Sequence, residues 1–162
     1  IYIHPNNPAD VPAMYKGHSE MWGPVWSWTV ETGSHALRIL FSGIFDRFPN
    51  AKLILGHMGE TLPYQLWRFD SRWAISNKGS KTLKRLPSEY FKKNFWCTTA
   101  GVCSDEPLRC AIEALGADRV MFSVDYPFER SEDAGKWIDN ANLSEIERSM
   151  VCYENAKSLL RL

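Results

Sequence analysis

Residues 53–60 read LILGHMGE, an apolar run that ends in glycine and is followed at once by a histidine and a glutamate. The run at 53–55 is apolar without interruption, which is typical of a strand buried on both faces of a parallel sheet. A helix is predicted to begin close behind it and to cover residues 61–76. The stretch therefore predicts one strand–helix unit that carries His57 and Glu60 at the tip of its strand.

The same order of strand and helix recurs along the whole chain. Strands are predicted at 2–4, 53–55, 95–98 and 120–123, and helices at 37–48, 61–76, 131–139, from 144 onward, and between an N-cap at Asp105 and a stop at Gly116. The basic residues at 77–85 predict a solvated loop. Repeated units of this kind indicate a parallel sheet with crossover helices, either an open doubly wound sheet or a (β/α)8 barrel. A barrel takes about 250 residues, so these units would supply half of one.

The composition is that of one globular domain, because 44% of the 162 residues are hydrophobic and 23% are charged. The formal net charge is zero, which argues against a nucleic acid or an acidic membrane surface as partner. No segment approaches the roughly 20 apolar residues of a membrane span. The spacing of the four cysteines matches no zinc or redox motif. We therefore expect a cytoplasmic protein with reduced, mostly buried thiols at Cys97, Cys103, Cys110 and Cys152.

Polar side chains stand where the predicted strands end. His4 follows the first strand, His57 and Glu60 follow the second, Thr98–Thr99 end the third, and Asp125 follows the fourth. In parallel α/β folds the carboxyl ends of the strands meet at one edge, where chemistry collects. A single histidine at a strand end is commonly structural, but three of the four strands repeat the placement. Imidazole and carboxylate ligands suit zinc, iron or manganese, so the pattern predicts a metal or acid–base site.

Several motifs are more specific than this spacing, namely IHP at 3–5, GHSEMWGP at 17–24, LILGHMGE at 53–60, WRFD at 67–70, FSVDYPFE at 122–129 and ENAKSLL at 154–160. Together they resemble the C-terminal half of the amidohydrolase-related (amidohydrolase 2) aromatic acid decarboxylases. The resemblance is strongest to the γ-resorcylate and 2,3-dihydroxybenzoate decarboxylases, which remove the carboxylate of dihydroxybenzoic acids without an organic cofactor. It extends over the whole chain.

The resemblance implies an α/β fold, the (β/α)8 TIM barrel of the metal-dependent hydrolase superfamily, of which this chain supplies about the last four β/α units. Residues 1–162 are then the C-terminal half of a single TIM-barrel catalytic domain. The resemblance implies that His4 and Asp125 bind one divalent metal ion, zinc or manganese. It also implies that His57 is catalytic, that Glu60 orients and polarises it, and that Asp125 takes part in proton transfer.

The implied substrate is a small aromatic carboxylic acid, specifically a hydroxylated benzoic acid. In the resemblance, Arg68 approaches the substrate or a neighbouring carboxylate, and Phe128 packs over the bound ring. His18 belongs to the same site or shapes its loop. Related enzymes form homo-oligomers, so a dimer or tetramer is expected. The tryptophans of the long loop before the first helix are predicted to line the pocket or a subunit interface: Trp22, Trp26 and Trp28.

The resemblance also places a Glu-x-His or His-x-His pair of metal ligands on the first barrel strand, and these 162 residues contain no such pair. The chain opens at Ile1 within a predicted strand, which agrees with the C-terminal half of a barrel. Two ligands alone hold a divalent metal poorly. The alternative functions are a metal-dependent hydrolase of a lactone or ester in the same superfamily, or an inactive half-barrel fragment.

Overall fold

The computed structural model describes residues 1–76 and 83–162, so most of the predicted loop at 77–85 lies outside the described residues. The described chain contains a sheet of four strands in the order β1-β2-β3-β4. Every neighbouring pair of strands is parallel. The strands are β1 Tyr2–Ile3, β2 Leu53–Leu55, β3 Phe95–Thr98 and β4 Val120–Met121. The predicted parallel sheet is confirmed, although the first and fourth strands are shorter than the predicted 2–4 and 120–123.

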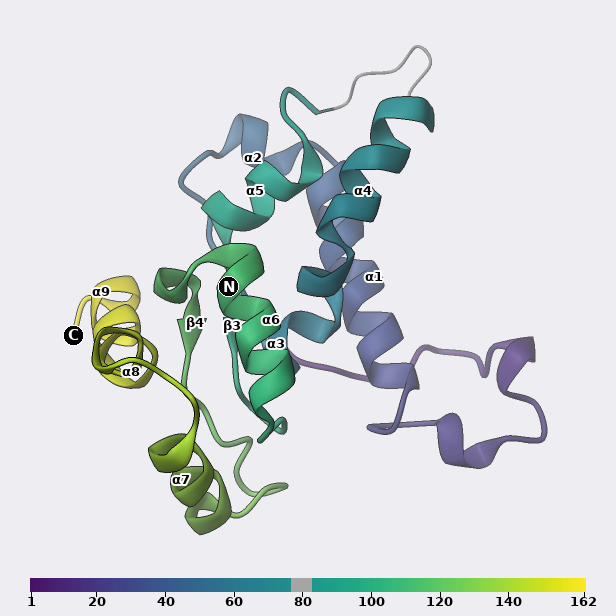
Figure 1. Cartoon of the computed structure of the whole chain (residues 1–162). Helices are drawn as coiled ribbons and strands as arrows, with labels where there is room; N and C mark the ends of the chain where they lie inside the picture. The colour runs from purple at the N-terminus through teal and green to yellow at the C-terminus, as the bar shows by residue number, and fades with distance from the viewer. Residues whose placement is uncertain (77–82) are drawn as a thin grey trace.

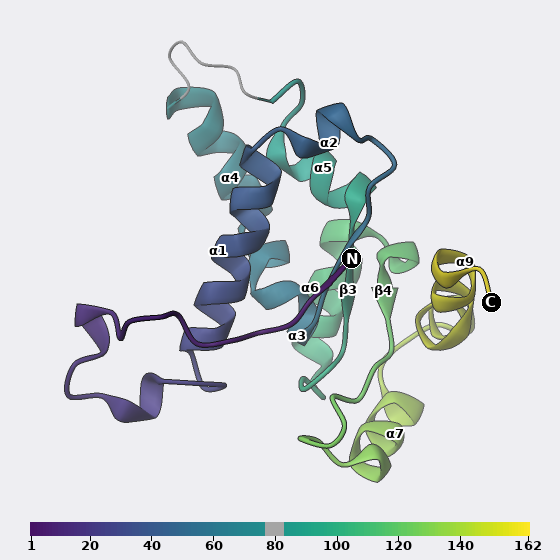
Figure 2. The same ribbon diagram turned by 180° about the vertical axis from the view of Figure 1, so that it is seen from behind.

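Helices provide the crossovers between these strands (Figure 1). They are α1 Ser27–Phe41, α2 Ile44–Arg47, α3 His57–Glu60, α4 Leu62–Ser76, α5 Pro87–Asn94, α6 Asp105–Leu115, α7 Ser131–Asn140, α8 Glu145–Ser149 and α9 Asn155–Leu160. Short 3-10 turns are η1 Ala13–Tyr15, η2 Ser19–Met21 and η3 Ala117–Arg119, and the π-helical segment η4 Met150–Glu154 joins α8 to α9. In Figure 1 helix α6 lies in front of β3, and in Figure 2 the strands lie in front of α6. Helix α6 therefore covers one face of the sheet.

The first long helix differs from the predicted 37–48 at both ends. Helix α1 begins at Ser27, and Gly43 interrupts the pattern before α2. Gly43 has a φ of 72°, a left-handed conformation that glycine adopts without the steric cost that other residues meet. The helical spacing of apolar residues continues across Gly43, so the sequence pattern predicts a single helix where the structure has α1 and α2.

Two further details of the helices correct the prediction. Helix α5 lies in a region where no helix is predicted, and its N-terminus is stabilised by the Glu89 carboxylate, which accepts the N–H of Leu86 at 2.8 Å. The N-cap of α6 is Ser104 rather than Asp105. The Asp105 carboxylate instead accepts hydrogen bonds from the Trp137 indole at 3.0 Å and from the N–H of Asn142 at 3.1 Å.

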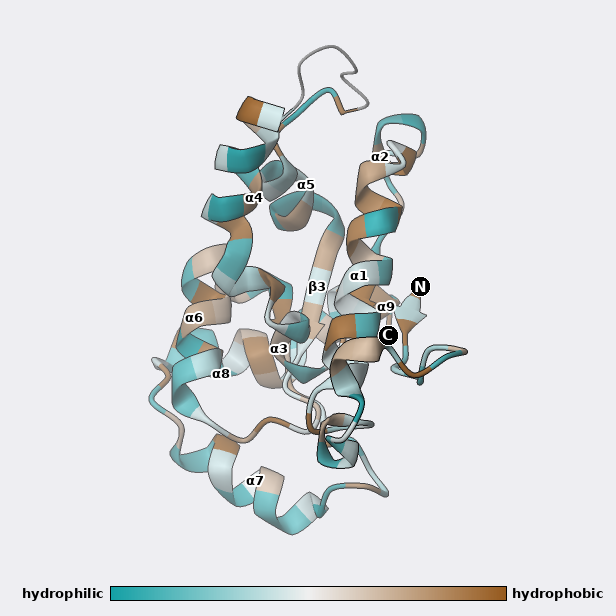
Figure 3. Cartoon of the chain, turned by 90° about the vertical axis from the view of Figure 1, so that its right-hand side faces the viewer, coloured by the Kyte–Doolittle hydropathy of each residue, from teal (hydrophilic) through white to brown (hydrophobic). Residues whose placement is uncertain are grey.

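Aromatic rings from α2, α5 and β3 form the centre of the core. The ring centroids of Phe91 and Phe95 are 4.4 Å apart, and those of Phe45 and Phe95 are 5.3 Å apart. All four residues of β3 are buried, and Figure 3 shows this strand, partly brown, between helices on either side. Burying one such ring stabilises the fold by about 1.5–3 kcal/mol. The core thus holds β3 rigidly beneath the edge where the polar residues gather.

Two expectations drawn from composition have different outcomes. All four cysteines have free thiols, as predicted, but only Cys97 is buried, while Cys103 and Cys152 are exposed and Cys110 is half-buried. Burial raises the pKa of Cys97 to about 12. Within residues 1–76 and 83–162, no helix has the length and apolar character needed to cross a membrane.

Candidate active site

Segment α3, which follows β2, is a single left-handed turn and not a regular right-handed helix. Residues 57–61 all have positive φ, between 48° and 78°. This conformation costs roughly 1–2 kcal/mol for each residue that has a side chain. A Cβ at Gly59 would lie 3.0 Å from ring atoms of Pro63, so a side chain there would also press on that ring. Strain of this kind is concentrated at functional sites.

The turn brings the side chains of His57 and Glu60 together. His57 Nδ1 lies 2.7 Å from Glu60 Oε1, and the Glu60 side chain is only 1% exposed. The carboxylate partner places a proton on Nδ1. Nε2, on the other side of the ring, is then the nitrogen that faces away from Glu60. The hydrogen bond to Glu60 raises the pKa of His57 against the opposing effect of burial, and the charges of Glu60 and Asp125 add to the rise.

Asp125 approaches the same imidazole from the loop after β4. Asp125 Oδ2 lies 3.6 Å from His57 Nε2, and both side chains are about three-quarters buried. The φ of Asp125 is 80°. Its carbonyl oxygen accepts the N–H groups of Phe128 at 2.9 Å and Glu129 at 3.1 Å, which closes a tight turn. His57 therefore stands between two carboxylates that come from different loops.

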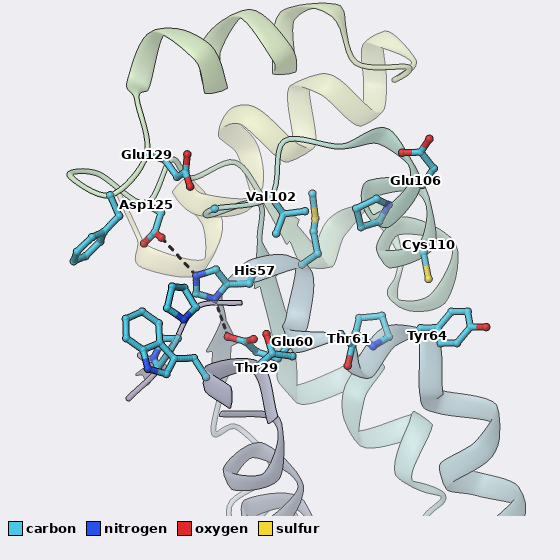
Figure 4. A pocket seen from close by; sticks show the side chains of 18 residues that line it. Thr29, His57, Glu60, Thr61, Tyr64, Val102, Glu106, Cys110, Asp125 and Glu129 are labelled. Carbon is cyan, nitrogen blue, oxygen red and sulfur yellow. Dashed lines mark hydrogen bonds and ion pairs between the residues drawn. The ribbon is translucent and has the colours of Figure 1, made fainter. Parts of the chain in front are cut away.

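These groups line one side of a cavity of about 1040 Å³ (Figure 4). Figure 4 shows His57 between Asp125 and Glu60, while Tyr64, Glu106 and Cys110 lie across the cavity. The wall is mostly apolar, as is usual for small-molecule sites. The wall also includes Pro5, Trp28, Thr29, Met58, Gly101, Val102 and Phe128.

Comparison with known sequences identifies the family. The sequence model of the amidohydrolase family matches residues 1–162. The chain belongs to the amidohydrolase family. It is 44% identical over 164 residues to the γ-resorcylate decarboxylase of Polaromonas sp. (strain JS666 / ATCC BAA-500), an alignment that covers 100% of this chain and 50% of that protein. This amidohydrolase chain therefore spans about half the length of the curated relatives it matches.

Two solved structures are similar to nearly the whole of this amidohydrolase chain. The dihydroxybenzoic acid decarboxylase of Polaromonas sp. JS666, with bound manganese and the inhibitor 2-nitroresorcinol, matches with a TM-score of 0.92 and 44% identity, over 99% of this chain and 49% of that one. A 2,6-dihydroxybenzoate decarboxylase in complex with 2,6-dihydroxybenzoate matches with a TM-score of 0.93 and 41% identity, over 99% and 50% of the two chains. The predicted fold class, four β/α units of a TIM barrel, is confirmed.

Two residues of this amidohydrolase chain fit part of a divalent-metal site. His4 Nδ1 lies 2.8 Å from the carbonyl oxygen of Pro5. When the proton is on Nδ1, the lone pair of Nε2 is available to a metal ion, which is the arrangement in metal-binding histidines. Asp125 offers a carboxylate oxygen at the same edge of the sheet. Across the described ranges, no group of three or more His, Cys, Asp or Glu residues is close enough to hold a metal ion. The donors are suitable in type but incomplete in number.

The structure brings only some of the predicted site residues together. His57, Glu60, Asp125 and Phe128 line the cavity, and His4 precedes the cavity residue Pro5. Arg68 lies on the exposed face of α4, outside the cavity. The exposed His18 has its Nδ1 3.0 Å from Glu20 and also lies outside. Of the three tryptophans expected in the loop, Trp28 lies in α1 instead and lines the cavity, where its indole donates to Asn7 at 2.7 Å.

Sequence reasoning missed other residues of the wall. Thr29 lies outside the predicted helix at 37–48 and Tyr64 lies inside the one predicted at 61–76, and neither stands at the end of a predicted strand. Gly101 carries a weak signal, since it closely follows a strand end in TTAG at 98–101. That signal points to a turn and does not reveal which side chains the glycine approaches.

Proposed function

We propose that the protein carrying these residues is a metal-dependent, non-oxidative decarboxylase that converts a dihydroxybenzoate to a dihydroxybenzene and carbon dioxide. One observation carries the proposal: the His57 imidazole is held at 2.7 Å from Glu60 on one nitrogen and at 3.6 Å from Asp125 on the other, at the wall of an apolar cavity. The names of the relatives, γ-resorcylate and 2,6-dihydroxybenzoate decarboxylase, support the same substrate class.

Decarboxylation of an aromatic acid needs a proton on the ring carbon that bears the carboxylate. The carbon–carbon bond then breaks, carbon dioxide leaves, and its bonding electrons restore the aromatic ring. We assign Asp125 to proton delivery at this carbon and His57 to proton exchange with the phenolic oxygen. Glu60 acts through His57, because its hydrogen bond fixes the tautomer and favours the protonated ring. Such acid–base assistance is worth roughly 10²- to 10⁴-fold in rate.

His4 and Asp125 would supply two ligands of one divalent metal ion, zinc or manganese, with no organic cofactor. When bound, such an ion orients the substrate's oxygens and neutralises negative charge. The manganese in the Polaromonas structure supports this choice of metal. In this proposal the remaining ligands are the Glu-x-His or His-x-His pair that the resemblance places on the first barrel strand, a pair that residues 1–162 do not contain.

We assign Phe128 to the substrate side of the cavity. Its side chain lines the cavity and is 72% exposed, so its ring is free to pack on a planar acid. The roles of Arg68 and His18 at the substrate stay predictions, since both side chains lie outside the cavity of this chain.

Residues 1–162 are, in this proposal, the C-terminal half of a single barrel domain in a cytoplasmic homo-oligomer, a dimer or tetramer. The half-length match to the relatives supports the first point. On α4, Trp67 lies outside the cavity and is 76% exposed, which supports a covered surface in an assembly. Native mass spectrometry tests both points. The proposal predicts a subunit about twice 18.6 kDa in an assembly of two or four, and a monomer of 18.6 kDa contradicts it.

The function itself is tested by assaying the full-length protein with manganese against 2,6- and 2,3-dihydroxybenzoate, with aryl lactones and esters in parallel. Carbon dioxide and the matching dihydroxybenzene are the expected products. His57→Asn serves as the site control, with its metal content measured beside the wild type. Hydrolysis of the lactones without carbon dioxide release would identify a hydrolase, and no turnover at all would identify an inactive barrel; either result overturns the proposal.

A further inference from the structure

The loop after β3 is joined to the segment that carries Asp125 through one buried side chain. The Thr99 hydroxyl donates to the carbonyl oxygen of Ser123 at 2.7 Å and accepts the N–H of the same residue at 3.0 Å. The N–H of Thr99 also donates to the carbonyl oxygen of Met121 at 3.0 Å. Thr99 is 1% exposed. These bonds continue the pairing of β3 and β4 past the end of the regular strands. They reach Ser123, which is two residues before Asp125.

Gly101 extends the same contact to the reactive groups. Its N–H donates to the carbonyl oxygen of Val124 at 3.3 Å, directly before Asp125. Its φ is 67°, and a Cβ there would lie 2.9 Å from His57 Cδ2 and 3.3 Å from Asp125 Oδ2. Because glycine has no side chain, the backbone of Gly101 can lie next to both the His57 imidazole and the Asp125 carboxylate.

We propose that Thr99 and Gly101 are positioning residues that set the separation between His57 Nε2 and Asp125 Oδ2. This inference deepens the proposed function and rests on it for its chemical meaning. Thr99 fixes the main chain that carries Asp125, and Gly101 leaves the space that the imidazole ring occupies. The resulting 3.6 Å exceeds the 2.7–3.2 Å of an ordinary hydrogen bond. The Asp125 carboxylate therefore lies beside His57 without forming an ordinary hydrogen bond to it.

This separation matters because proton transfer depends steeply on geometry. A misplacement of about 1 Å is enough to lower a rate by about 10²-fold. Thr99→Val removes the hydroxyl at constant shape and leaves the N–H and C=O of Ser123 without their partner. Thr99→Ser retains the hydroxyl and discriminates hydrogen bonding from packing. Gly101→Ala adds one methyl group at the contact itself. Gly135→Ala on α7 is the matched control, since a Cβ there meets nothing within 4 Å.

The test uses the full-length protein with manganese and two readouts, steady-state kinetics and crystal structures of the variants. Gly101→Ala and Thr99→Val are expected to lower kcat by about 10²-fold, with KM changed far less, because binding contacts to the ring remain. Thr99→Ser and Gly135→Ala are expected to stay close to wild type. In the Gly101→Ala crystal structure, the distance between His57 Nε2 and Asp125 Oδ2 should increase.

An unchanged distance in Gly101→Ala, or a kcat in that variant equal to that of Gly135→Ala, overturns the inference. If Thr99→Val does not fold, the Gly101→Ala structure still decides. Failure of the proposed function is recognised separately: the wild type releases no carbon dioxide. In that case the crystallographic comparison continues to test whether Thr99 and Gly101 set the separation.

Discussion

At the scale of single residues, the hydrogen bond between Glu60 and His57 favours the protonated form of the imidazole. The bond holds the pKa of His57 above its usual value of about 6.5. A raised pKa in the folded state means that the pair stabilises the fold below pH 6.5 or so, and that this stabilisation disappears as pH rises through the folded value. The same rise extends upward the pH range over which His57 carries a proton that it can donate.

Glu60→Gln tests this effect. The amide retains the shape but not the charge, so the pKa of His57 should fall, and the pH at which turnover declines on the alkaline side should move downward. The loss of this support should also lower kcat by about 10- to 100-fold. Rates measured from pH 5 to 9 check both effects. An alkaline limb that coincides with that of the wild type contradicts the assignment of Glu60.

Gly59 and Gly135 make a matched pair for the strained turn after β2. Gly59 has a φ of 78°, and a Cβ there would lie 3.0 Å from Pro63. Gly59→Ala should lower the free energy of unfolding by at least about 1–2 kcal/mol. Gly135→Ala, in open space within α7, should raise it by about 0.5–1 kcal/mol through the entropy of the unfolded chain. Urea denaturation of both variants gives the comparison, and equal effects would argue against a strained turn.

At the scale of elements, a polar contact joins α2 to α5. The Tyr90 hydroxyl donates to Asp46 Oδ1 at 2.6 Å and accepts the N–H groups of Lys84 at 3.1 Å and Arg85 at 3.2 Å. Burial favours the neutral form of Asp46, but the bonds from Tyr90 and Lys84 outweigh it and hold the pKa of Asp46 below its usual value. The resulting stabilisation is complete above pH 4 or so and is lost as pH falls through the lower folded pKa.

Tyr90→Phe should therefore lower the free energy of unfolding by about 2 kcal/mol at pH 7, because the hydrogen bond from the buried Tyr90 to the half-buried Asp46 carboxylate is lost. The difference from wild type should shrink as the pH is lowered below 4. The control is Tyr153→Phe, at a side chain that is 56% exposed. Thermal melts at several pH values provide the data. Equal stability of the two variants at pH 7 would show that the contact contributes nothing.

The elements also show how far a sequence predicts this fold. Strands β2 and β3 and helix α4 agree with the prediction, since each has an uninterrupted apolar run or a long helical period. Helix α5 has only eight residues, too few to display that period clearly. The break at Gly43 was missed because an apolar pattern does not record a positive φ.

The candidate site shows the same division. His57, Glu60 and Asp125 were predicted because each stands at a strand end within a recognisable motif. The contacts of Thr99 and Gly101 depend on the register of β3 against β4 and on the space beside His57. Strand register and the space beside a side chain depend on segments that are far apart in the sequence, so these contacts could be found only in the structure.

At the scale of the whole molecule, the C-terminal helices cover the outer side of β4. The buried Asn155 amide donates to the carbonyl oxygens of Ala117 and Val120, each at 2.7 Å. The N–H of Phe122 donates to the carbonyl oxygen of Val151 at 2.7 Å. Helix α9 is thereby joined to the strand whose continuation carries Asp125. The geometry of the site thus depends on an element at the far end of the chain.

Asn155→Ala should lower the free energy of unfolding by about 2–3 kcal/mol, because it leaves two buried carbonyl groups without a donor. Asn140→Ala is the control, since this exposed side chain bonds to Lys136 within its own helix. Chemical denaturation measures both. A loss no greater than that of the control would contradict the view that α9 is essential to this edge of the sheet.

Turnover of 2,6-dihydroxybenzoate in D2O shows whether this site delivers a proton to the ring carbon as carbon dioxide leaves. The full-length protein with manganese should release carbon dioxide and form resorcinol with one deuterium, at the carbon that lost the carboxylate, as NMR and mass spectrometry detect. His57→Asn should lower the rate by about 10²- to 10⁴-fold. Unchanged substrate, or an equal rate in the variant, would contradict the claim.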